Sequence, residues 1–148
     1  MKHIESRIQK SCVRWFRLNY PELAGNLFSI PNGGKRNQVT AANLKAEGAL
    51  AGVSDLFLAV PNDKAHGLFV EMKAPGGRLT EKQIIFKENV MDEGYAFAVC
   101  HSFDEFEQAV TKYLTLTAKK TILRPVSDTF SVNEYKSFAK YKSSLKRM

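Results

Sequence analysis

The chain has 148 residues, 44% of them hydrophobic and 25% charged, which fits one globular domain with its own core. It has no apolar run of the roughly 18 residues that a membrane span requires, and its charged start does not resemble a signal peptide. The net charge of +7 is uneven, because residues 1–118 have 14 Lys/Arg and 13 Asp/Glu whereas residues 119–148 have 8 and 2.

The first half of the chain is predicted to form a helix, a strand and a second helix. Apolar residues recur at three- and four-residue steps over residues 3–19, which predicts a helix that ends before Pro21. A short strand over residues 27–30 runs into a Pro-Asn-Gly-Gly loop. A second helix is expected over residues 37–47.

The second half is predicted to alternate strands and helices. Two apolar runs joined by a Pro-Asn-Asp-Lys turn are typical of paired strands, and a Ser-Phe-Asp-Glu capping box predicts the start of the last helix. The apolar run after Gly94 lacks polar alternation, so we expect that strand to be buried on both faces. These segments are strands 54–60, 67–73 and 95–100 and helices 81–92 and 103–114. The whole order predicts an α/β fold, with a mixed β-sheet flanked by α-helices.

The end of the chain differs in composition from the rest. Residues 115–130 are typical of a linker, and a second capping box at Ser131 begins a short basic helix. We therefore divide the chain into a domain over residues 1–118 and a basic C-terminal extension over residues 119–148. The charge of this extension favours either a polyanionic partner or a solubilising tail.

Cysteine and histidine give no sign of a disulfide or of a zinc site. Cys12 and Cys100 are the only cysteines, and both lie on expected buried faces. Free cysteines in a reducing cytosol are the favoured interpretation. The three histidines are scattered and show no zinc spacing.

Two acids and a lysine at the ends of apolar strands are the main candidate for chemistry. Asp55 begins one predicted strand, and Glu71 and Lys73 end the next, where alternation directs both side chains to one face. Carboxylates are good ligands for Mg²⁺ or Mn²⁺, and the backbone carbonyl of Met72 could add a third oxygen. Such a metal and a charged lysine suit hydrolysis of a phosphodiester bond.

These residues resemble the VRR-NUC domain, a member of the PD-(D/E)xK nuclease superfamily. The tripeptide E-x-K alone is common, but a glycine-flanked Asp, E-x-K at strand spacing and then L-T-x-x-Q are together far more specific. The resemblance runs from about residue 5 to residue 114. It is strongest in IPNGGKR (30–36), GALAGVSDL (48–56), FVEMK (69–73) and GRLTEKQ (77–83).

The resemblance implies a restriction-endonuclease-like fold and a role for each acid. It implies metal ligation by Asp55 and Glu71 and a catalytic role for Lys73. Similar domains also use a glutamate on the first helix and a glutamine after the lysine strand, which correspond to Glu5 and Gln83.

Two positions depart from the superfamily pattern, and two roles have alternatives. Lys87 stands where a tyrosine is frequent, and the proline often found before the aspartate is absent. Glu5 could instead be a first-turn acid that favours the helix dipole. Gln83 could instead close a capping box with Thr80, and both of its roles could coexist.

Nucleic-acid contacts are predicted in two loops. Gly33, Gly34, Lys35 and Arg36 resemble a phosphate-contacting loop, and Arg78 is a similar candidate; a solvated turn is the alternative for each.

The resulting hypothesis is a Mg²⁺- or Mn²⁺-dependent endonuclease that cuts DNA. The sequence contains no base-reading motif, which favours recognition of DNA shape. Small stand-alone domains of this family resemble dimeric Holliday-junction-resolving enzymes of phages and bacteria. The resemblance thus implies branched DNA as substrate, a homodimer, and the cytoplasm of a bacterium or phage-infected cell. The alternatives are a non-catalytic nucleic-acid-binding module and a nuclease that acts on flaps or RNA.

Overall fold

A four-stranded mixed β-sheet is the centre of the structure, a computed structural model that describes residues 2–31 and 38–116. The strand order is β1-β2-β3-β4. The first three strands are antiparallel neighbours, whereas β3 and β4 are parallel. The strands are β1 (Leu27–Ser29), β2 (Leu56–Leu58), β3 (Leu68–Met72) and β4 (Ala96–Cys100).

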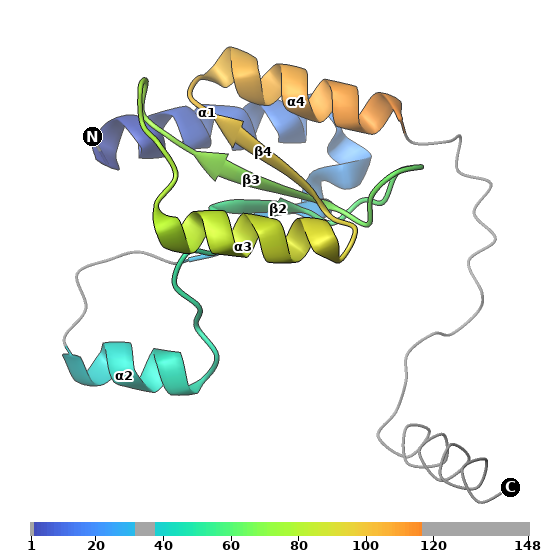
Figure 1. The fold of residues 1–148 in the computed structure, drawn as a ribbon. Coiled ribbons are helices and arrows are strands. Elements are labelled where there is room, and N and C mark those ends of the chain that lie inside the picture. The colour runs from blue at the N-terminus through green and yellow to red at the C-terminus, as the bar shows by residue number, and fades with distance from the viewer. Residues whose placement is uncertain (1, 32–37, 117–148) are drawn as a thin grey trace, which may run out of the picture. The chain divides into compact units, whose positions relative to one another are not determined.

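Helices cover both faces of this sheet. Figure 1 shows α1 and α4 on one face and α3 on the other. The helix α2 differs from these three, because its described side chains are exposed apart from the partly buried Leu44. The helices are α1 (Lys2–Asn19), α2 (Gln38–Ala46), α3 (Glu81–Asp92) and α4 (Phe103–Thr115), with a 3₁₀ helix η1 (Pro21–Asn26) after α1.

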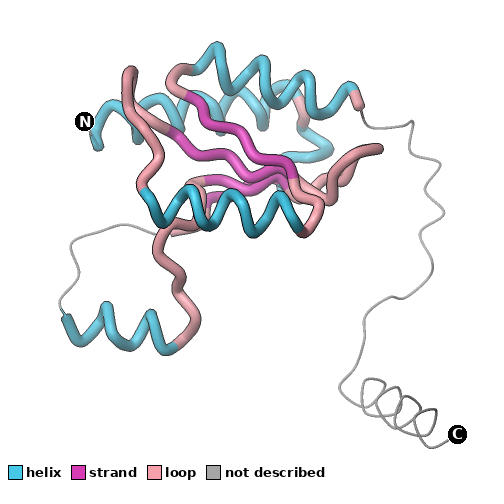
Figure 2. Tube along the Cα trace, viewed as in Figure 1, coloured by secondary structure: helices cyan, strands magenta, loops and turns pink. Residues whose placement is uncertain are grey.

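Local sequence signals fix the ends of α3, which links the two parallel strands. Thr80 and Gln83 form a complete capping box at its start. At its end Glu93 is the C-cap, and Gly94 follows with φ of 84°, a left-handed conformation that glycine adopts without penalty. The helix is thus confined to the length that returns the chain to β4 beside β3 (Figure 2).

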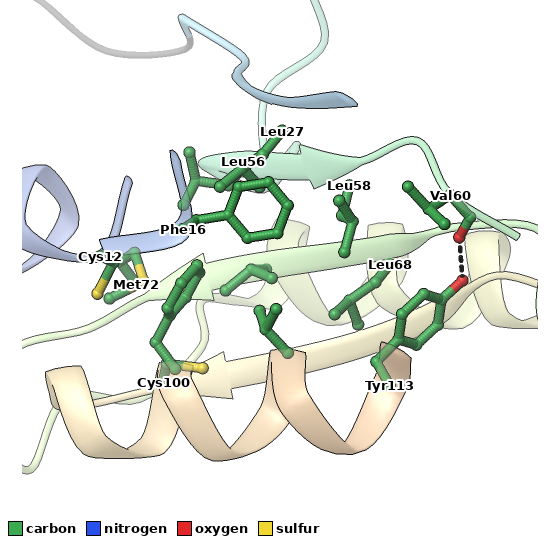
Figure 3. Close-up of a cluster of buried hydrophobic side chains, with 13 residues drawn as sticks. Cys12, Phe16, Leu27, Leu56, Leu58, Val60, Leu68, Met72, Cys100 and Tyr113 are labelled. Atoms are coloured by element: carbon green, nitrogen blue, oxygen red, sulfur yellow. Dashed lines mark hydrogen bonds between the residues drawn. The ribbon is translucent and has the colours of Figure 1, made fainter. Parts of the chain in front are cut away.

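The core lies between the sheet and the α1/α4 layer, as Figure 3 shows. Alternation along β3 buries Val70 and Met72 there and leaves Glu71 for the other face. Cys12 and Phe16 are the matching fully buried residues of α1. The buried hydroxyl of Tyr113 is paired, because it donates a hydrogen bond to the carbonyl of Val60 at 2.7 Å.

The predicted α/β fold is confirmed, including the order of helices and strands. Burial raises the pKa of the Cys12 thiol to about 12 and that of Cys100 to about 11, so both are inert free thiols. No helix in the described residues is long and apolar enough to cross a membrane. The basic extension over residues 119–148 lies outside the described residues and stays a prediction.

Three details of the predicted elements were wrong. The 3₁₀ helix η1 was not expected, because Pro21 ends α1 but also suits the first turn of a new helix. The strand predicted over residues 54–60 is shorter, so Asp55 lies just before β2. β4 is mostly half-buried rather than fully buried, because it is an edge strand of the sheet.

Candidate active site

The candidate residues come from four separate elements that meet at one end of the sheet. Asp55 precedes β2, Glu71 lies in β3, and Lys73 directly follows β3. Gln83 is in the first turn of α3, and Glu5 is in the first turn of α1. Figure 1 shows the first turns of α1 and α3 at the end of the sheet where β3 finishes.

Glu71 is at the centre of a hydrogen-bonded group. Its Oε1 accepts from Gln83 Nε2 at 2.6 Å and lies 3.2 Å from Lys73 Nζ. Lys73 Nζ also donates to Gln83 Oε1 at 2.9 Å, so the three side chains close a ring of contacts. Glu71 is only 3% exposed, and its Oε2 is buried with no hydrogen-bond partner among the described residues.

Gln83 makes contacts to both the helix cap and the acid–lysine pair. Its Oε1 accepts from the backbone N–H of Thr80 at 2.9 Å as well as from Lys73. The Thr80 Oγ1 accepts in return from Gln83 N at 3.4 Å. The capping-box interpretation is therefore confirmed, and it leaves Gln83 Nε2 available to Glu71.

Asp55 and Glu5 attach neighbouring elements to the end of β3. Asp55 Oδ2 accepts from the Met72 N–H at 2.8 Å. Glu5 Oε1 accepts from the Ala74 N–H at 3.1 Å. The two N–H groups belong to the residues immediately before and after Lys73. Both carboxylates are thereby close enough to Glu71 to act on its charge.

The carboxylates at this site repel one another, which disfavours the charged forms of Asp55 and Glu71. Burial, and then the nearby Asp55 carboxylate, raise the pKa of Glu71 to about 7, although Lys73 acts in the opposite direction. The pKa of Asp55 is also raised, chiefly by burial, while its hydrogen bond from Met72 opposes the rise. Glu5 adds a smaller repulsion at both acids. The site thus concentrates negative charge that a bound cation would stabilise.

The residues present fit a hard divalent cation. Glu71 Oε2 has no hydrogen-bond partner in the described part of the chain, and Asp55 and the Met72 carbonyl could offer further oxygen donors. Within the described residues, no three His, Cys, Asp or Glu side chains gather closely enough to hold a metal by themselves. Glu5 is engaged with Ala74 in this arrangement. Two carboxylates and one backbone carbonyl are therefore the oxygen atoms that could hold such a cation.

His101 is a neighbour of the site that the sequence analysis did not single out. Its Nε2 lies 2.9 Å from the Gly77 carbonyl oxygen, and its Nδ1 lies 3.1 Å from Glu105 Oε2. Neither partner has a proton to donate, so only the charged imidazolium satisfies both. The Gly77 carbonyl and then Glu105 accordingly raise the pKa of His101. His101 thereby ties the end of β4 to the loop that follows Lys73.

The capping box predicted at Ser102 is only half correct. Ser102 Oγ accepts from Glu105 N at 3.1 Å, as expected. The Glu105 carboxylate, however, accepts from His101 N at 2.7 Å instead of from Ser102. In the sequence, the spacing of four residues between His101 and Glu105 could have indicated this contact.

The structure bears unequally on the predicted nucleic-acid contacts. Arg78 is exposed in the loop between β3 and α3, next to Gly77. Gly33, Gly34, Lys35 and Arg36 lie outside the described residues. All five stay predictions.

Comparison with known proteins agrees with the resemblance found in the sequence. The model of the VRR-NUC domain family matches residues 3–104. A solved structure described as a "VRR_NUC domain protein" is similar with a TM-score of 0.66 and 24% sequence identity, over 76% of this chain and 88% of that one. No curated protein matches the chain.

Proposed function

The chain belongs to the VRR-NUC domain family of nucleases, which are generally metal-dependent, and on this premise we propose that it is an Mg²⁺- or Mn²⁺-dependent endonuclease that hydrolyses DNA. The observation that carries the proposal is the buried Glu71. One of its carboxylate oxygens is bound by Lys73 and Gln83, while the other has no partner among the described residues.

Each side chain has a distinct role in this proposal. Asp55, Glu71 and the Met72 carbonyl would hold the cation, with Glu5 beside them. A bound Mg²⁺ or Mn²⁺ would supply Lewis acidity for the phosphate and an activated water. Lys73, held by Gln83 and Glu71, places a fixed positive charge where negative charge develops on the phosphate. Gln83 positions Lys73 and Glu71 through its two amide atoms.

We propose branched DNA, of the Holliday-junction type, as the substrate. The sequence has no recognition-helix or zinc-finger pattern, so specificity has to come from the shape and the phosphates of the nucleic acid. A homodimer acting in the cytoplasm would place two such sites on two strands of a junction. Sedimentation of the protein on a four-way junction tests the dimer, and a bound monomer alone would contradict it.

Cleavage of a substrate panel tests the catalytic proposal. Wild type and Lys73→Ala are compared with Mg²⁺ on labelled four-way junction, flap, linear duplex and RNA, with Lys112→Ala, an exposed lysine of α4, as the matched control. Loss of one electrostatic contact to the transition state is expected to lower the rate by about 10²–10³-fold. Equal cleavage by wild type and Lys73→Ala would remove Lys73 from the mechanism.

The same panel separates the alternative functions. Cutting confined to flaps or RNA would replace the junction-resolving proposal. Tight binding without cleavage of any substrate would favour a non-catalytic module. The buried carboxylate and its lysine partner argue against that module, because binding alone does not require them.

A further inference from the structure

The outward face of α1 is rich in basic side chains. Cys12 and Phe16 define the buried face of this helix, and the basic residues lie on the opposite side, at alternating steps of four and three residues. All of these side chains are exposed. We call them the α1 stripe: His3, Arg7, Lys10, Arg14 and Arg17.

The helix α1, which carries the α1 stripe, accounts for the positive charge of the domain. Residues 2–19 have five Lys/Arg against the single acid Glu5, a net of +4. Residues 20–118 have nine Lys/Arg against twelve Asp/Glu, a net of −3. The overall near-neutrality of residues 1–118 thus hides one basic helix on an otherwise acidic body.

Nothing in the described part of the chain neutralises the α1 stripe. No side chain of Arg7, Lys10, Arg14 or Arg17 forms an ion pair with another described residue. The acid Glu5 lies on the other side of the helix and accepts the Ala74 N–H. The positive field of the stripe is therefore directed into solvent.

This arrangement works against the stability of the helix. Like charges three or four residues apart repel, and the stripe contains such pairs from Arg7 to Arg17. A helix face that only needs to be soluble usually mixes both signs. A polyanion bound along the stripe would convert these repulsions into attractions.

The first turn of α1 lies beside the candidate active site, although the α1 stripe itself faces away from Glu5. The bond between Glu5 and Ala74 fixes the first turn of α1 beside the residue that follows Lys73. From Arg7 to Arg17 the helix then rises by about 15 Å, at 1.5 Å per residue. Duplex DNA carries one phosphate charge per roughly 1.7 Å of its axis, so several phosphates fit along this length.

We propose that the α1 stripe binds the phosphate backbone of a double-helical DNA arm that extends beyond the scissile bond. This inference rests on the proposed nuclease function and adds to it a second binding surface. The arm is recognised by its charge and not by its bases. The stripe therefore contributes affinity and orientation without touching the reacting phosphate.

The test compares two variants with the same change of charge. Lys10→Gln/Arg14→Gln removes two charges from the middle of the stripe, and Lys64→Gln/Lys112→Gln removes two from exposed positions elsewhere. Glutamine keeps helix propensity, so α1 is expected to fold. Binding of the full chain to a fluorescent 30-base-pair duplex is followed by anisotropy in EDTA as NaCl is raised from 50 to 200 mM. Cleavage of bis(p-nitrophenyl) phosphate with Mn²⁺, a probe too small to reach the stripe, reports on the carboxylate site.

The expected result is a change in salt dependence for one variant only. Each lost phosphate contact lowers the slope of log K against log [NaCl] by about 0.9, so Lys10→Gln/Arg14→Gln should lower it by about 1.8. Its rate on the small phosphodiester should equal that of wild type. An unchanged slope, or the same change in the control variant, would overturn the inference. Stripe-dependent binding by a wild type that cleaves no substrate would instead overturn the proposed function alone.

Discussion

Replacement of Glu71 by glutamine is expected to stabilise the metal-free protein above neutral pH and to abolish cleavage. Glutamine has the shape of the protonated acid, and its oxygen can still accept from Gln83 Nε2. The buried carboxylate, in contrast, has a pKa raised to about 7 by burial and then by Asp55. The stability of the fold and the chemistry of the site therefore favour different residues at this position.

The magnitude follows from the difference between the two states of the chain. The pKa of Glu71 is about 7 in the folded protein and 4.5 as its ordinary value, so between these limits the folded state holds a proton that the unfolded chain releases. The stability that this bound proton contributes is fully present below pH 4.5 and is lost as the pH rises through 7. At about 1.4 kcal/mol per tenfold change in proton affinity, the loss is about 3 kcal/mol.

Urea unfolding measures this loss directly. In EDTA, the free energy of unfolding of Glu71→Gln minus that of wild type should increase by about 3 kcal/mol between pH 4.5 and pH 8.5. Glu88→Gln, on the exposed side of α3, is the control and should track wild type. Mg²⁺ should then stabilise wild type but not Glu71→Gln, because only wild type keeps the ligand. Parallel pH profiles for Glu71→Gln and wild type would refute the reasoning.

Four further substitutions separate structure from chemistry. Thr80→Ala and Gln83→Ala each break the capping box and should lower the free energy of unfolding by about 1 kcal/mol. Only Gln83→Ala should also slow cleavage. An equal loss of cleavage in both variants would mean that Gln83 acts only through the stability of the helix. Glu5→Gln keeps an acceptor for the Ala74 N–H and should keep the fold while weakening Mg²⁺ binding in calorimetry, and unaltered affinity would exclude Glu5 from the metal site. His101 has a raised pKa, so its contribution to the stability of the fold is present at low pH and is lost as the pH rises through the folded pKa. In urea unfolding, His101→Ala should therefore cost more stability at pH 5 than at pH 9. An equal cost at both pH values would contradict a charged imidazolium.

The fold and the centre of the site were predictable because both depend on short-range patterns. Apolar spacing identified α1 and α3, and two alternating runs identified the pair β2 and β3. The register of that pair, with Leu56 opposite Val70, places Asp55 next to Glu71 as soon as the two strands pair. A sequence that fixes this pairing also fixes the proximity of the two acids.

Contacts across loops were not predictable in the same way. The bond between His101 and Gly77 joins positions 24 residues apart, and it depends on the path of the loop after β3. Half-burial of β4 depends on its place at the edge of the sheet, which its own residues do not encode. The bond from Glu5 to Ala74 spans 69 positions, and only the family resemblance pointed to Glu5.

The residues of the candidate site are dispersed along the chain, so the site is complete only when the whole domain is present. Glu5 lies on the first helix of the domain, whereas Gln83, which holds both Lys73 and Glu71, comes much later in the chain. A nascent or proteolysed fragment that ends before α3 lacks the group that orients the lysine and the acid. We therefore expect such a fragment to lack the proposed nuclease activity.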